Sequence, residues 1–76
     1  MNTFDFEFYI HTTRASARAL YSSELLRIDS VSVLNRDDSD PEKDIISVSG
    51  SSTREGAVLI VENTDIQIIS LCAATV

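Results

Sequence analysis

Cysteine is almost absent from this sequence, which has a single one, Cys72, among 76 residues. One thiol cannot form a disulfide within the chain, and small secreted domains usually depend on several. The N-terminus carries Asp5 and Glu7 rather than the basic start of a signal peptide. No apolar run reaches the roughly 18 residues of a membrane-spanning helix. We therefore expect a cytoplasmic protein that does not bind membranes, with Cys72 buried and inert in an apolar strand.

Histidine is equally scarce, since His11 is the only one. A single His and a single Cys indicate neither a closed zinc site nor a thiol–imidazole nucleophile. General acid–base chemistry at His11 would need a nearby carboxylate such as Glu24 or Asp29. The sequence also lacks a G-x-S-x-G motif and a glycine-rich phosphate loop. We expect no enzyme, no cofactor and no metal, and we interpret His11 as an exposed residue at a strand end.

Basic residues are few, with 6 lysines and arginines against 12 acidic residues and a net charge of −6. Phosphate backbones are bound by surplus lysine and arginine, so direct nucleic-acid binding is disfavoured. An acidic surface suits a basic partner protein, because complementary potentials steer association. The same charge also serves simple solubility.

Hydrophobic residues make up 43% of the chain, enough for one modest core in a single domain, residues 1–76. Residues 4–11 alternate between Phe4, Phe6, Phe8 and Ile10 on one side and polar residues or Tyr9 on the other, which predicts a half-buried strand. From Thr13 the apolar spacing becomes helical, and the pattern predicts a helix that begins at a Thr12 or Thr13 cap and ends near Leu25 or Leu26.

Four more strands are predicted, over residues 27–34, 45–49, 57–61 and 66–72. The apolar phase shifts between Ile28 and Val31, which indicates a β-bulge. Residues 50–56 (GSSTREG) have the composition of a turn, and Asn63 suits a tight hairpin with positive φ. The predicted fold is α+β, a two-layer sandwich in β-α-β-β-β-β order, with one helix packed on a mainly antiparallel sheet.

The segment DDSDPEKD, residues 37 to 44, holds five carboxylates in eight positions. An EF-hand is excluded, because Lys43 and Ser49 occupy the places that its glycine and its bidentate glutamate require. A solvated hairpin loop, a weak irregular cation site and an acidic knob that contacts a partner remain open. The residues predicted to bind a partner are Asp37, Asp38, Asp40, Glu42 and Asp44, with Asp5 and Glu7 as a second patch.

The C-terminal predicted strands are apolar on both faces, although one helix can cover only one of them. Either these strands are central in an imperfect sheet, or the second face is buried against another subunit. The second reading predicts a homodimer. Its self-association residues would be Leu59, Val61, Ile69 and Leu71.

In gross features, being tiny, acidic and without catalytic residues, the chain resembles small inhibitors encoded by phages and mobile elements, including anti-CRISPR proteins. The resemblance assigns no role to any individual residue. Our leading hypothesis is a non-enzymatic, dimeric, acidic inhibitor of a basic, nucleic-acid-binding protein. The alternative is a structural or assembly subunit that acts by self-association.

Overall fold

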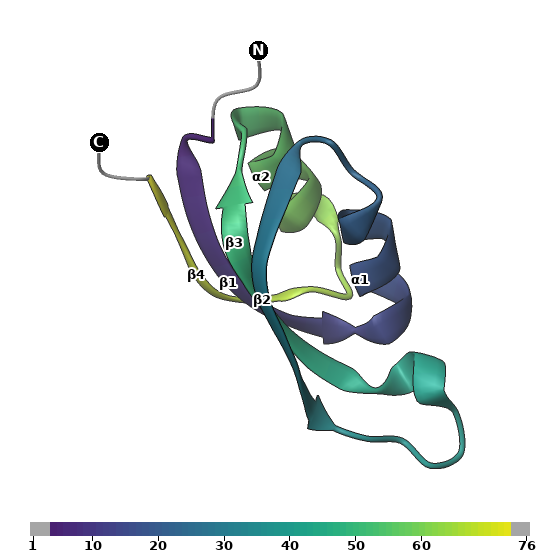
Figure 1. Ribbon diagram of the computed structural model, residues 1–76. Coiled ribbons are helices and arrows are strands. Elements are labelled where there is room, and N and C mark those ends of the chain that lie inside the picture. The colour runs from purple at the N-terminus through teal and green to yellow at the C-terminus, as the bar shows by residue number, and fades with distance from the viewer. Residues whose placement is uncertain (1–3, 74–76) are drawn as a thin grey trace.

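The computed structural model describes residues 4–73 and contains four strands and two α-helices (Figure 1). In chain order these are β1 (Phe6–Thr13), α1 (Arg14–Tyr21), β2 (Leu26–Asn35), the 3-10 helix η1 (Pro41–Lys43), β3 (Ile45–Ser52), α2 (Arg54–Glu62) and β4 (Gln67–Ala73). The α+β class is confirmed. The order is β-α-β-β-α-β, that of split β-α-β folds, so the prediction of one helix and five strands is wrong.

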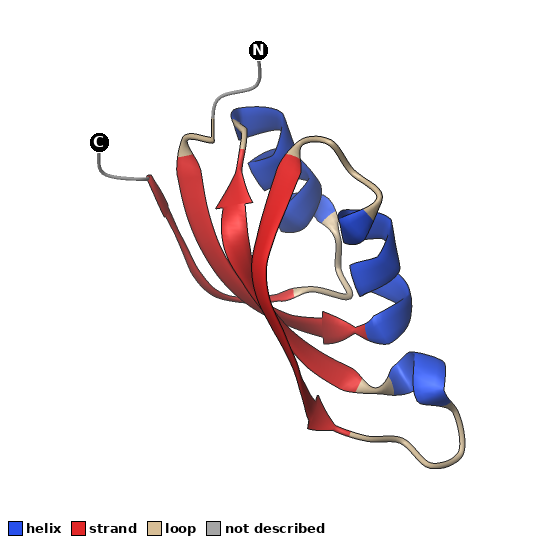
Figure 2. Cartoon of the chain, in the orientation of Figure 1, coloured by secondary structure: helices blue, strands red, loops and turns tan. Residues whose placement is uncertain are grey.

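The four strands form one open, fully antiparallel sheet in the order β2-β3-β1-β4 (Figure 2). The first strand lies at its centre, between β3 and β4, because each helix connects strands that are not neighbours in the sheet. Strands that follow one another in the sequence were predicted to pair as hairpins, and only β2 and β3 do so. The long strand β2 and the short strand β4 are the two edges.

The hydrophobic core lies on the side of the sheet that both helices cover. Phe8 and Ile10 of β1 are buried with Val48 of β3, while Glu7 and Tyr9 point to the open side, as the alternation in β1 predicts. Helix α1 contributes Ala17 and Leu20, and α2 contributes Ile60, which has no exposed surface. Burial of these side chains is what fixes the two helices on one face.

Helix α1 begins where the sequence predicts and ends earlier. The hydroxyl of Thr13 accepts a hydrogen bond from the Ser16 amide, so Thr13 is the N-cap. The helix ends at Tyr21 and Ser22 is its C-cap. The chain then turns in residues 22–25 and Leu26 starts β2, because Leu26 belongs to the core beneath the sheet.

Helix α2 replaces a predicted turn and a predicted strand. Residues 50–52 extend β3, and the Thr53 hydroxyl caps the helix by accepting from the Gly56 amide at 3.2 Å. Gly56 allows close packing, since a Cβ there would lie 2.7 Å from the Leu25 carbonyl oxygen. Asn63 has φ of −83°, so the predicted left-handed turn is also wrong.

The β2–β3 hairpin forms an arm, which we define as residues 29–48; its loop end reaches beyond the helices, while Ile46 and Val48 remain in the core, and the molecule measures 42 × 20 × 19 Å (Figure 1). The predicted bulge is confirmed as a register shift between Ile28 and Ser30. Gly50 lies opposite Ile28 at this shift, and only glycine fits there, since a Cβ would lie 2.0 Å from the Arg27 carbonyl oxygen. Neither α1 nor α2, within the described chain, is long and apolar enough to cross a membrane.

Candidate functional site

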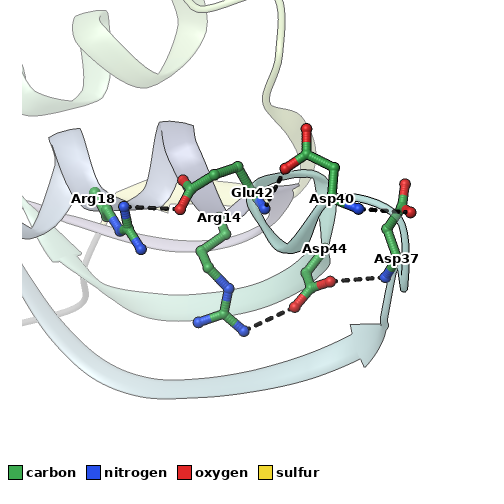
Figure 3. Close-up of polar contacts among 6 residues, drawn as sticks. All are labelled: Arg14, Arg18, Asp37, Asp40, Glu42 and Asp44. Carbon is green, nitrogen blue, oxygen red and sulfur yellow. Dashed lines mark hydrogen bonds and ion pairs between the residues drawn. The ribbon is translucent and has the colours of Figure 1, made fainter.

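The acidic segment at the tip of the arm is an ordered loop built by its own carboxylates (Figure 3). One Asp37 oxygen, Oδ1, accepts hydrogen bonds from the backbone amides of Ser39 and Asp40 and from the Ser39 hydroxyl. Asp40 caps η1, because its Oδ1 accepts from the Glu42 amide at 3.1 Å. Pro41 opens that helical turn. These bonds are the local side-chain-to-backbone contacts that aspartate favours in turns.

Asp44 closes the base of the loop. It is buried, and its Oδ1 accepts from the Asp37 amide at 2.7 Å while its Oδ2 meets Arg14 Nη2 at 3.0 Å. The Arg14 amide also donates to the Asp44 carbonyl oxygen. The hydrogen bond from the Asp37 amide, followed by that from Arg14, lowers the pKa of Asp44. The bonds from Ser39 likewise lower the pKa of Asp37.

A second ion pair holds the loop against α1, since Arg18 Nη1 lies 2.8 Å from Glu42 Oε1. Of the five loop acids, Asp38 alone makes no hydrogen bond or ion pair within residues 4–73, and it is exposed. The loop is therefore braced by α1 rather than free, and Asp38 is the carboxylate left for an external contact.

A hollow of about 380 Å³ lies under the loop. Its lining residues are Arg14, Arg36, Asp37, Asp38, Pro41 and Asp44. The five loop acids face four cations in and beside the loop, Arg14, Arg18, Arg36 and Lys43. The tip of the arm thus carries an excess of one negative charge, against three for residues 36–44 taken alone.

Asp5 and Glu7, the second predicted acidic patch, lie at the other end of β1. The Asp5 amide donates to Ser52, and Glu7 is opposite Ser51, whereas the loop joins β3 at Ile45, opposite Thr13. Thr13 is six positions along the strand from Glu7, a distance of roughly 20 Å. The structure does not bring the two predicted acidic patches together.

The predicted self-association residues fall on two elements instead of two paired strands. Leu59 and Val61 are exposed on α2, Ile69 is exposed on β4, and Leu71 is partly buried against the core. Cys72 is exposed on the edge strand β4, so the prediction of a buried thiol is wrong. The reason is that Cys72 lies opposite Glu7 on the open face of the sheet, whereas Leu71 lies opposite buried Phe8 on the core face.

His11 lies near the end of β1, as predicted, but it is half-buried on the open sheet face rather than exposed. Its ring packs edge-on against Tyr9, with centroids 5.4 Å apart. Its Nε2 is buried and makes no hydrogen bond to any residue from 4 to 73, so neither Glu24 nor Asp29 bonds this nitrogen. Within the same range, no three His, Cys, Asp or Glu side chains cluster closely enough to hold a metal ion.

The arm carries an exposed apolar surface that the sequence pattern does not predict. Val31 lies opposite buried Val48, and Val33 lies opposite buried Ile46, yet these valines are 44% and 40% exposed. Leu34 and Ile45 on the same arm are also exposed. The alternation of residues 27–34 correctly predicted a strand, but only the structure shows that Val31 and Val33 stay exposed opposite buried residues.

No protein family model, no curated protein and no solved structure matches this chain.

Proposed function

We propose that this chain is a non-enzymatic protein-binding module that presents its β2–β3 arm to a basic partner protein. The observation that carries the proposal is the exposed strip of Val31 and Val33, which continues the core face of the sheet into solvent. Apolar side chains that gather on one exposed surface mark sites of protein interaction. The edge of β2 beside them offers unpaired backbone groups to an incoming strand.

The contacts of the loop with α1 support this role. Two ion pairs, Arg14–Asp44 and Arg18–Glu42, hold the loop at its tip against α1. A surface that is ordered before binding loses less conformational entropy when the partner docks. Asp44 stabilises the loop itself. Asp38 and the outer oxygens of Asp37, Asp40 and Glu42 form the polar rim of the proposed interaction surface.

The net charge of −6 favours a basic partner, because opposite potentials raise the rate of encounter. An acidic module of this kind would inhibit a nucleic-acid-binding protein by covering the surface meant for the phosphate backbone. Phage-encoded anti-defence proteins of the anti-CRISPR type, which the sequence resembles in gross features, are inhibitors. A cytoplasmic location belongs to the same proposal, since the single thiol, Cys72, is unpaired and exposed.

The test uses the tagged full-length chain as bait in an extract of its own host cells, followed by purification of the captured protein and measurement of its Kd. The double variant Val31→Thr/Val33→Thr keeps the β-branched shape and removes apolar surface. We expect it to weaken binding at least tenfold. Thr64→Ser, an exposed change away from the arm, is the matched control. An unchanged Kd for the double variant, or the absence of any saturable partner, would contradict the proposal.

The second candidate function, an assembly subunit, is favoured by a different observation. Helix α2 is apolar on its packed side and also exposes Val58, Leu59 and Val61. A helix that is hydrophobic on all sides is usually buried. Concentration-dependent particles larger than a dimer would favour this alternative over an arm-mediated binding module.

A further inference from the structure

A shallow groove of about 310 Å³ runs beside α2, on the side toward the start of β1. Its lining residues are Phe6, Arg54, Ala57, Val58, Val61 and Glu62. Five of these form a single stripe along α2, because the spacings of three, one, three and one residues return to the same side of a helix. The stripe has an apolar middle and one charge at each end.

The two end charges are placed against the helix dipole. Arg54 is the first residue of α2 and Glu62 the last, whereas the N-terminus of a helix favours anions and the C-terminus favours cations. They are eight residues apart, about 12 Å along the axis, which is too far for them to pair within one helix. Neither side chain makes an ion pair with any residue between 4 and 73.

We propose that a second copy of this chain covers the stripe, with the two α2 helices antiparallel and Val58 near the two-fold axis. Val58 is midway between Arg54 and Glu62, so this arrangement sets Arg54 of each copy beside Glu62 of the other. The stripe is thus complementary to itself in charge, as a two-fold interface requires. Val58 and Val61 make the apolar contact, since Ala57 is only 8% exposed at the border of the stripe, and the two helix axes would lie about 8–10 Å apart. This inference does not depend on the partner of the arm.

The arrangement explains which exposed apolar residues of α2 take part. Val58 lies on the stripe and is 47% exposed, while Leu59 lies off the stripe and is 45% exposed. The two side chains are nearly equal in exposure and differ in position, so a change at Leu59 is the control for the same change at Val58. We expect Val58→Ser to raise the dimer dissociation constant at least tenfold and Leu59→Ser to leave it nearly unchanged.

Charge reversal tests the antiparallel register directly, with mass measured by light scattering from about 10 µM to 1 mM, a range that spans the affinities of modest interfaces. We expect the wild type to move from 8.4 kDa to twice that mass. Arg54→Glu alone creates Glu–Glu contacts and Glu62→Arg alone creates Arg–Arg contacts, so each should weaken the dimer at least tenfold. Both changes improve the match to the helix dipole, so the variants should stay folded by circular dichroism.

Mixing the two single variants gives the decisive result. In a heterodimer, the glutamate introduced by Arg54→Glu in one copy faces the arginine introduced by Glu62→Arg in the other. The second contact joins the unchanged Glu62 of the first copy to the unchanged Arg54 of the second, so both contacts become attractive. We expect the equimolar mixture to recover the wild-type dissociation constant within about threefold. A wild type that remains at 8.4 kDa throughout, single variants that dimerise normally, or a mixture that stays monomeric would each overturn the proposal.

Discussion

At the scale of the residue, the buried carboxylate of Asp44 makes the acidic loop respond to pH, together with Asp37, whose pKa is also lowered. Asp44 accepts from the Asp37 amide and from Arg14, and the pKa of Asp44 in the folded chain is lowered by these bonds. The unfolded value is about 3.9. Between the two values the unfolded chain binds more protons than the folded chain, so stability rises with pH across that window.

We therefore predict that the stabilisation from Asp44 is complete above about pH 5 and is lost as the pH falls below about 4 toward the folded-state pKa. Asp44→Asn should lower the free energy of unfolding at pH 7 and flatten its decline in acid. Urea unfolding at a series of pH values measures both effects. Asp38→Asn, at an acid without hydrogen bonds in residues 4–73, is the control and should keep the wild-type slope. An Asp44→Asn slope equal to the wild type would contradict this account.

The same residues show what could be predicted for the site. Five acids around Pro41 correctly indicated a loop, because aspartate bonds to nearby amides in turns. The two ion pairs from α1 join residues that are far apart in the chain, so no local pattern could reveal them. That Arg14 and Arg18 offset part of the negative charge of the tip could therefore not be predicted from the sequence.

At the scale of the element, α2 shows where reading by pattern fails. The run from Ala57 to Val61 is short and β-branched, and a run of this length fits either a buried strand or a buried helix. Thr53 as a possible cap and the buried spacing of Gly56, Ala57 and Ile60 are the helical signals that the sequence did contain. The strand β1 was predicted well because its alternation extends over eight residues.

The cap at Thr53 is the contact that should matter most for α2. Thr53 is buried and its hydroxyl accepts from the Gly56 amide. We predict that Thr53→Ala lowers the free energy of unfolding by about 1–2 kcal/mol, the usual loss for a helix cap. Thermal or urea unfolding measures it. Thr64→Ala, at an exposed position after the helix, should change stability by less than about 0.5 kcal/mol. Equal effects of the two changes would show that Thr53 does not fix the helix.

At the scale of the whole molecule, the exposed apolar residues lie on two separate surfaces. One is the strip of Val31 and Val33 on the arm, and the other is the α2 stripe. We propose that the first binds a basic partner and that the second binds another copy of the chain. From the excess of apolar residues in the sequence we predicted self-association. The strand order and the shape of the arm depend on pairing between distant segments, which local sequence patterns do not reveal.

Hydrogen exchange of the full-length chain, measured with and without the protein that it captures, tests the central claim most directly. Backbone amides become protected where a partner covers them or pairs with a strand edge. We predict new protection in residues 30–35 of β2 and in the acidic loop, residues 36–44, with little change at the start of β1 around Asp5 and Glu7. Protection confined to the start of β1 or to α2, with the arm exchanging as in the free chain, would contradict the account.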